Sequence, residues 1–295
     1  MGREFRVLTY RVLSTACRQP IAKSPMTQHR IQRGEMTLAC AEHGAGTPVV
    51  LVHGFPLDHT MWQPQIDALQ ATCRVIALDL RGFGNSTLAT DDASAGVDMQ
   101  VYAADILATL DEIGIREPAI LCGFSMGGYV VWQFVLANPQ RVRAIVVCDS
   151  RADADSEEKS RGRLKMAEEV LQTGAEPVAN TMLPKLLARE TIASRQSLAE
   201  QVWTMICRAS PKAIAAAQRG MARRPDVRSQ LREIDKPALM LVGVEDALSP
   251  PEHMREIANS LPEGRIVEIP AAGHMTTVEN PAAVNESIRD FVASL

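Results

Sequence analysis

The sequence predicts an α/β protein: a doubly wound, mostly parallel β-sheet with a helical cap inserted into it. Short, almost continuously apolar segments recur along the chain, as is typical of strands buried on both faces of a parallel sheet. Amphipathic helical patterns lie between most of these segments, which favours alternating strands and helices. One long interval, residues 151–235, has helical patterns and no strand candidate.

Six segments are predicted to form the strands of this sheet. They are VVLVHG (49–54), RVIALDL (74–80), AILCGFS (119–125), AIVVCDS (144–150), ALMLVGVED (238–246) and RIVEIPAAGH (265–274). Parallel neighbours in a sheet are joined by crossover connections, which are right-handed in nearly all proteins. The helical segments between the strands are therefore expected to cover both faces of the sheet.

Helices are predicted from the spacing of apolar residues. In residues 97–115 the apolar side chains at helical spacing are Val101, Ile106, Leu107, Leu110 and Ile113. The last helix is expected to begin with Asn280 as its N-cap and Pro281 at its first position. Together the patterns divide the chain into a core of residues 26–150 and 236–295 and a helical cap of residues 151–235.

The first 25 residues differ from the rest in charge. Their basic residues, opposed only by Glu4, are Arg3, Arg6, Arg11, Arg18 and Lys23. They contain no sustained apolar core such as a secretory signal needs, and no run in the chain approaches the 18 or so apolar residues of a membrane span. We expect a flexible tail, or a start codon upstream of a true start at Met26.

Composition and charge restrict the kinds of partner. The chain has 295 residues, 46% hydrophobic and 22% charged, with a net charge of −4, so neither nucleic acid nor a membrane is expected as a partner. Its six cysteines form no C-x-x-C pair, which favours reduced thiols in the cytoplasm. The chain lacks Walker, H-E-x-x-H and Cys/His motifs, and Thr87 replaces the third glycine of a dinucleotide loop in RGFGNST, so no metal or cofactor is predicted.

One serine stands between glycines where a strand pattern gives way to a helix pattern. Residues 123–127, Gly-Phe-Ser-Met-Gly, match the G-x-S-x-G nucleophile elbow. In that turn the glycines permit close backbone approach, and the serine hydroxyl projects beyond the carboxyl end of its strand. The pattern therefore predicts Ser125 as a nucleophile.

A serine hydroxyl needs a base, and the base needs an orienting partner. His274 follows the last predicted strand and is the candidate base. Asp246, after the preceding strand, is the candidate acid, and the order Ser, Asp, His fits the hydrolases that use this elbow. Glu245 adjoins Asp246, and Asp149 also ends a predicted strand, so both are alternative acids.

From about Met26 onward, these motifs resemble the α/β-hydrolase superfamily. The chain is most similar to the capped branch of carboxylesterases, 3-oxoadipate enol-lactonases and cofactor-free haloperoxidases or perhydrolases. HGFPLD (53–58) resembles the oxyanion loop of that branch, and DLRGFGNS (79–86) its D-x-R-G-x-G-x-S segment. The resemblance implies an oxyanion hole formed by the backbone N–H groups of Phe55 and Met126, and a loop-shaping role for His53. It favours Asp246 over Glu245. Surface or turn positions are expected for His29, His43, His59 and His253.

The resemblance implies hydrolysis of a small or medium carboxylic ester or lactone, without a cofactor. Aspartate replaces the serine in haloalkane dehalogenases and epoxide hydrolases, so Ser125 argues against those reactions. Pro56 occupies a position where haloperoxidase-like and perhydrolase-like members often have proline, which makes peracid formation a neighbouring activity. A slow-turnover receptor or regulator of the same fold is the alternative from another class. No oligomeric state is predicted.

Overall fold

A computed structural model describes residues 26–295, so the prediction of a tail or misassigned start concerns residues outside this range. The described residues contain one eight-stranded sheet. Its strands are β1 (Thr27–Arg33), β2 (Met36–His43), β3 (Thr47–Val52), β4 (Cys73–Asp79), β5 (Ala119–Phe124), β6 (Val142–Cys148), β7 (Ala238–Gly243) and β8 (Gly264–Ile269). Their order in the sheet is β1-β2-β4-β3-β5-β6-β7-β8.

The sheet is mostly parallel, as the sequence predicts. From β4 to β8 all neighbouring strands run parallel, whereas β1 pairs antiparallel with β2, and β2 with β4. Every residue of β5 and β7 is buried. Such strands have a helix layer on each face, which explains their continuous apolar runs.

The sequence prediction is wrong at three places in the sheet. It misses the β1–β2 hairpin, in which Ile31 is the one buried residue of β1. It extends the last two strands too far, because β7 ends at Gly243 and β8 at Ile269. It also expects β8 to be buried on both faces, but β8 is an edge strand with mostly part-exposed or exposed residues.

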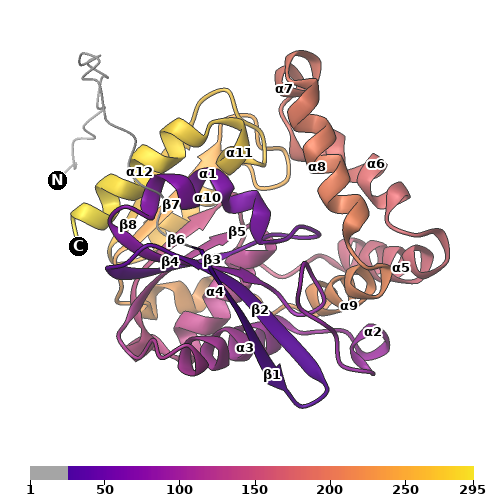
Figure 1. The fold of residues 1–295 in the computed structure, drawn as a ribbon. Coiled ribbons are helices and arrows are strands. Elements are labelled where there is room, and N and C mark those ends of the chain that lie inside the picture. The colour runs from indigo at the N-terminus through magenta and orange to yellow at the C-terminus, as the bar shows by residue number, and fades with distance from the viewer. Residues whose placement is uncertain (1–25) are drawn as a thin grey trace.

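Helices cover the sheet on both sides. The helices of the core are α1 (Gln63–Leu69), α2 (Asp92–Ala95), α3 (Met99–Glu112), α4 (Met126–Ala137), α10 (Pro251–Ser260), α11 (Thr276–Glu279) and α12 (Pro281–Ala293). Short 3₁₀ helices are η1 (His59–Trp62), η2 (Pro139–Arg141) and η3 (Arg228–Glu233). Figure 1 shows α1 and α12 side by side on one face and α3 and α4 on the other.

The structure tests the predicted N-cap of the last helix and the predicted apolar side of α3. The Asn280 side chain accepts a hydrogen bond from the N–H of Ala283, and Pro281 is the first residue of α12, so the predicted N-cap is confirmed. Val101, expected on the apolar side of its helix, is instead exposed. Ile106 and Leu110 are buried and Leu107 and Ile113 pack against the core as predicted, whereas Tyr102 and Ala103 are buried in place of Val101.

Between β6 and β7 lies a helical insert, residues 151–235. It contains α5 (Glu157–Thr173), α6 (Glu176–Leu186), α7 (Arg189–Ser194), α8 (Gln196–Arg208) and α9 (Pro211–Ala222), together with η3. In Figure 1 its α-helices stand to the right of the sheet, with α5 packed on α9 and α6 on α8. The described helices include none with the length and apolar character that crossing a lipid bilayer requires.

Candidate active site

Ser125 lies in a strained turn between β5 and α4. Its backbone has φ 50° and ψ −113°, a region that costs a non-glycine residue about 1–3 kcal/mol. A Cβ atom at Gly123 would clash with the backbone of Gly127, and one at Gly127 with the backbone of Val52. The two glycines therefore let α4 pack closely against the sheet, which holds the serine at the carboxyl end of β5.

The three predicted catalytic side chains are joined by hydrogen bonds. His274 Nε2 lies 2.9 Å from Ser125 Oγ, and His274 Nδ1 lies 2.8 Å from Asp246 Oδ2. The other Asp246 oxygen accepts from the N–H groups of Leu248 and Ser249, at 2.8 and 3.0 Å. Burial alone would raise the pKa of Asp246. The charge and hydrogen bond of His274, together with the two backbone donors, outweigh burial and hold that pKa below its usual value.

The alternative acids have other environments. The N–H of Gly243 donates to Asp149 Oδ1 at 2.9 Å, and the Thr276 hydroxyl donates to Asp149 Oδ2. Neither oxygen is hydrogen-bonded to His274 within residues 26–295. Complete burial, and next the charge of a nearby carboxylate, raise the pKa of Asp149 well above its usual value. Glu245 is exposed.

Two backbone N–H groups beside Ser125 are without acceptors. No carbonyl or side-chain acceptor within the described range is hydrogen-bonded to the N–H of Phe55 or of Met126. Met126 is the first residue of α4, so its N–H belongs to a helix N-terminus, where negative charge is favoured. Phe55 lines the same cavity as Ser125. These donors suit the predicted oxyanion hole.

His53 supports the loop that carries Phe55. Its Nδ1 donates to the carbonyl of Gly54 at 2.9 Å, and its Nε2 accepts from the N–H of Leu80 at 2.9 Å. This pattern needs a neutral ring, and complete burial lowers the pKa of His53 accordingly. The geometry suits the predicted loop-shaping role.

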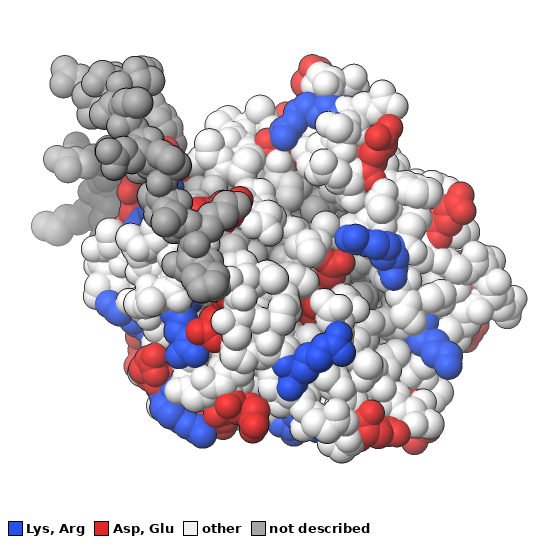
Figure 2. Space-filling view, in the orientation of Figure 1, with Lys and Arg blue, Asp and Glu red and all other residues white. Residues whose placement is uncertain are grey.

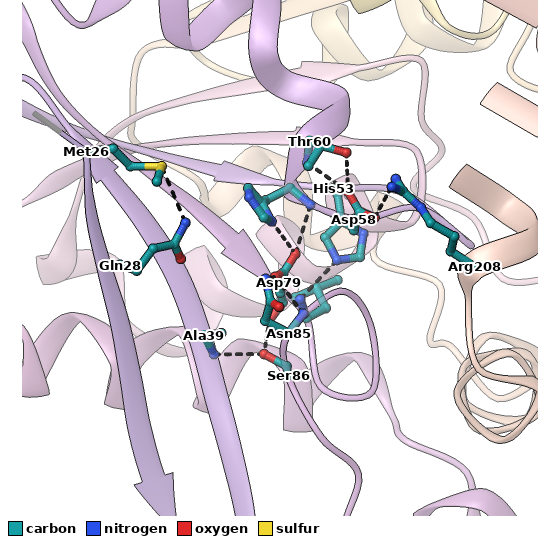
Figure 3. Close-up of polar contacts among 12 residues, drawn as sticks. Met26, Gln28, Ala39, His53, Asp58, Thr60, Asp79, Asn85, Ser86 and Arg208 are labelled. Carbon is teal, nitrogen blue, oxygen red and sulfur yellow. Dashed lines mark hydrogen bonds and ion pairs between the residues drawn. The ribbon is translucent and has the colours of Figure 1, made fainter. Parts of the chain in front are cut away.

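Asp79 joins the same loop to the segment that follows β4 (Figure 3). Asp79 Oδ1 accepts from the N–H and Nδ1 of His59, at 2.9 and 2.7 Å, and Oδ2 accepts from the N–H of Asn85 at 2.9 Å. The Ser86 hydroxyl donates to the Asp79 carbonyl at 2.7 Å. His59 is thus a partly buried partner of Asp79, and the expectation of an ordinary surface or turn residue is wrong. Burial lowers the pKa of His59, but the contact with Asp79 outweighs burial and raises it.

His59 and Asp79, together with Asp58, also form a candidate metal cluster. Asp58, His59 and Asp79 bring potential ligand atoms within 4.8 Å of one another. Both Asp79 oxygens, however, already accept hydrogen bonds from N–H donors, and Asp58 Oδ1 caps η1 at the N–H of Thr60. These hydrogen bonds show that the cluster holds the loop in place. They leave few lone pairs on the carboxylate oxygens for binding an ion.

Glu279 is a buried residue of the site that the sequence analysis misses. Its Oε1 accepts from the N–H groups of Gly273 and Met275, at 2.9 and 3.2 Å, and its Oε2 accepts from the N–H of Ala188 at 2.8 Å. The carboxylate thus holds the chain on both sides of His274 and ties it to the helical insert. The sequence offers one indication, the position of Glu279 five residues after His274, but this spacing alone does not reveal which N–H groups donate to the carboxylate.

Glu279→Gln is expected to destabilise the protein and to misplace His274. An amide NH₂ would face a backbone N–H that has lost its acceptor, which costs roughly 1–3 kcal/mol of unfolding free energy. Small misplacement of a catalytic group costs up to about a hundredfold in rate, so we expect kcat/KM to fall by about ten- to a hundredfold. Denaturant unfolding and ester hydrolysis measure the two effects. Exposed Glu286, on α12, provides the matched control Glu286→Gln; equal behaviour of the two variants would contradict this role for Glu279.

The cavity beside Ser125 lies between the core and the helical insert. It has a volume of about 370 Å³. The core contributes Phe55, Ser125, Tyr129 and His274 to its walls, and the insert contributes residues of α5, α6 and α9. A pocket of this size encloses a small ligand. A substrate carbonyl in the cavity would thus lie among the side chains described above.

Comparison with known protein families shows the family to which this chain belongs. The family described as the alpha/beta hydrolase fold matches residues 47–281. The chain belongs to this family. The sequence-based resemblance is thereby confirmed, and the α/β-hydrolase fold agrees with the mostly parallel sheet and its helices.

Relatives of this α/β hydrolase include several kinds of enzyme. The chain is 30% identical to 3-oxoadipate enol-lactonase 1 of Acinetobacter baylyi over 84% of this chain and 89% of the relative. A thermophilic esterase from Thermogutta terrifontis, solved with malate bound, is 38% identical with a TM-score of 0.86, covering 91% of this chain and 98% of that one. A bromoperoxidase from Bacillus anthracis, 22% identical, shares the fold with a TM-score of 0.78 over 91% of this chain and 100% of that one.

Proposed function

We propose that this α/β hydrolase cleaves a small or medium carboxylic ester or lactone through an acyl-enzyme on Ser125. The observation that carries the proposal is the continuous pair of hydrogen bonds from Ser125 Oγ to His274 and from His274 to Asp246. The esterase and the enol-lactonase among the relatives support the choice of bond. No step of the mechanism below needs a cofactor.

The first half-reaction forms the acyl-enzyme. Because Nδ1–H of His274 donates to Asp246, Nε2 is free to take the proton of Ser125 as its Oγ attacks the carbonyl carbon. The N–H groups of Phe55 and Met126 then donate to the new oxyanion. As the tetrahedral intermediate collapses, His274 returns the proton to the leaving alkoxide or enolate. In a lactone this leaving group remains tethered to the acyl chain.

The second half-reaction releases the acid. His274 takes a proton from water, the resulting hydroxide attacks the acyl carbon, and collapse restores the Ser125 hydroxyl with the proton from His274. Asp246 stabilises the imidazolium in both halves. A slow-turnover receptor of the same fold would form the acyl-enzyme on Ser125 and would not hydrolyse it. Repeated turnover therefore distinguishes an enzyme from a receptor.

The test is turnover of p-nitrophenyl esters of increasing chain length, together with a small lactone panel. We expect many turnovers per protein molecule, and labelling of Ser125 alone by a serine-directed organophosphorus reagent, located by peptide mass spectrometry. Stoichiometric release of p-nitrophenol without further cycling would favour the receptor. Labelling at another residue would contradict the assignment of the nucleophile.

The helical insert, residues 151–235, is proposed to act as a cap that limits the length of the acyl chain. The cavity of about 370 Å³ is partly walled by Met166 and Met182 of the insert, so short and medium acyl esters are expected to be hydrolysed at least about tenfold faster than palmitoyl esters. Met182→Ala should shift the preferred chain length upward. Met205→Ala is the matched control, because Met205 belongs to the insert but lines a different cavity. Efficient hydrolysis of emulsified long-chain triacylglycerol with interfacial activation would contradict a cap of this kind.

A further inference from the structure

The cavity beside Ser125 has an excess of positive charge. Its charged lining consists of one carboxylate, Asp155, and four cations, Arg151, Lys159, Arg163 and Lys185, of which Arg151 is balanced by an ion pair with Asp153 at 2.7 Å. The whole chain, in contrast, has a net charge of −4. On the face in Figure 2, Lys and Arg side chains are interspersed with Asp and Glu. The cavity thus differs in sign from the protein as a whole, and a concave cationic surface concentrates anions.

Part of this charge lies beneath the cavity, where two arginines share one carboxylate. The Arg163 guanidinium contacts Asp155 Oδ2, and Arg224 Nη1 lies 2.8 Å from the same oxygen. Arg224 also lies over the ring of Tyr129, 4.4 Å from its centroid. Burial raises the pKa of Asp155, but the arginines outweigh burial and lower it, so the carboxylate is ionised. The group of three therefore retains one positive charge in a poorly hydrated place.

Two lysines add charge that is not paired with a carboxylate in the described part of the chain. Lys159 extends from α5 and Lys185 from α6, and both are exposed. Neither ammonium forms an ion pair with a carboxylate between residues 26 and 295, whereas Lys165, also on α5, pairs with Glu169 at 3.6 Å. Because both lysines line the same cavity as Ser125, a ligand bound there can reach their ammonium groups.

We propose that the substrate is an ester or lactone with a second, free carboxylate, which binds Lys159 and Lys185 while the reacting carbonyl lies at Ser125. The inference rests on the hydrolase function proposed above and names its substrate class. Met166, Met182 and Leu186 also line the cavity, and they suit an aliphatic segment between the two carbonyl groups. A monoester of a dicarboxylic acid has this combination of a neutral ester, an aliphatic spacer and an anion.

The experiment compares two substrates of equal shape and different charge. Monoethyl adipate has a free carboxylate, and its neutral analogue has a primary amide in the same place. We expect the parent protein to prefer the carboxylate in kcat/KM by about tenfold or more, which corresponds to about 1.4 kcal/mol. The preference should shrink as ionic strength rises from about 0.05 M to about 1 M, because exposed charges are screened by salt.

Variants assign the preference to the two lysines. Lys159→Met and Lys185→Met keep an unbranched helix-forming side chain and remove the charge. The double variant should lower the ratio of kcat/KM for monoethyl adipate to kcat/KM for the amide at least about fivefold. Lys165→Met is the matched control, since Lys165 lies on α5 outside the cavity, and it should retain the full preference.

The outcomes separate the two proposals. Hydrolysis of p-nitrophenyl butyrate with equal use of the acid and amide substrates would overturn the carboxylate site and leave the hydrolase function standing. A carboxylate preference that the double variant retains would also overturn the assignment to Lys159 and Lys185. Failure to turn over p-nitrophenyl esters, lactones and both adipates would contradict the hydrolase function itself.

Discussion

Ser125→Ala is expected to abolish ester hydrolysis and to leave the protein folded. Loss of the nucleophile of a serine triad costs on the order of a million-fold in turnover, because no acyl-enzyme can form. The side chain of Ser125 forms one hydrogen bond in the described structure, to His274, and alanine faces the same backbone strain at φ 50°. Initial rates with p-nitrophenyl butyrate measure the loss, and thermal unfolding reports the fold.

A matched serine provides the control. Ser287 lies on α12, and its hydroxyl donates to the Ala283 carbonyl at 2.8 Å, so Ser287→Ala should retain both activity and melting temperature. More than a few per cent of parental activity in Ser125→Ala, towards every ester tested, would refute the proposed mechanism. If Ser125→Ala were unfolded, the organophosphorus label on the parent protein would still test the nucleophile.

The sequence predicts the central sheet well, because its signal is local. β3 to β7 are largely buried, so their composition is mostly apolar, with Arg74, Asp79 and Arg143 as the charged exceptions, and differs from that of the flanking turns. β1 lacks such a signal: it pairs only with β2, and most of its side chains are exposed. Backbone pairing, which composition does not encode, therefore explains why the hairpin was missed.

In the candidate site, too, local features can be predicted from the sequence, whereas contacts between distant residues cannot. The elbow around Ser125 depends on close backbone contacts of Gly123 and Gly127, so the motif can be recognised from these glycines in the sequence. The bonds of Asp79 to His59 and Asn85 join segments up to 20 residues apart, and that of Glu279 to Ala188 spans 91 residues. Contacts of this kind arise only when the fold brings their segments together.

The lining of the cavity is the part least accessible from sequence. Met166 and Met182 have the helical spacing of ordinary core residues, yet both face the cavity. The positive charge of this cavity could not be predicted from the sequence either, because Lys159 and Lys185 lie in separate helices and resemble any other exposed lysine. Tertiary packing between α5 and α6 and the core brings these side chains together.

Asp246, the proposed acid of the triad, is expected to respond to substitution very differently from Asp149, its alternative. Asp246→Asn should lower turnover at least a hundredfold, because an asparagine amide cannot hold His274 in the tautomer with Nε2 free. The corresponding change in the best-studied serine hydrolase costs about ten-thousand-fold, and a nearby carboxylate can offset part of the loss. Initial rates should be measured at one fixed pH for the parent protein and all variants.

Asp149→Asn is the matched comparison, and we expect it to cost less than about tenfold, since Asp149 is not bonded to His274 in the described structure. Its raised pKa favours the protonated acid, and an asparagine can still accept from the N–H of Gly243 while its NH₂ donates to the Thr276 hydroxyl. The variant thus preserves the shape and most of the bonding of the native side chain. The opposite ranking, measured on folded variants, would transfer the orienting role to Asp149 and leave the roles of Ser125 and His274 unchanged. The hydrogen bond of 2.8 Å between His274 Nδ1 and Asp246 is the physical reason to expect the first ranking.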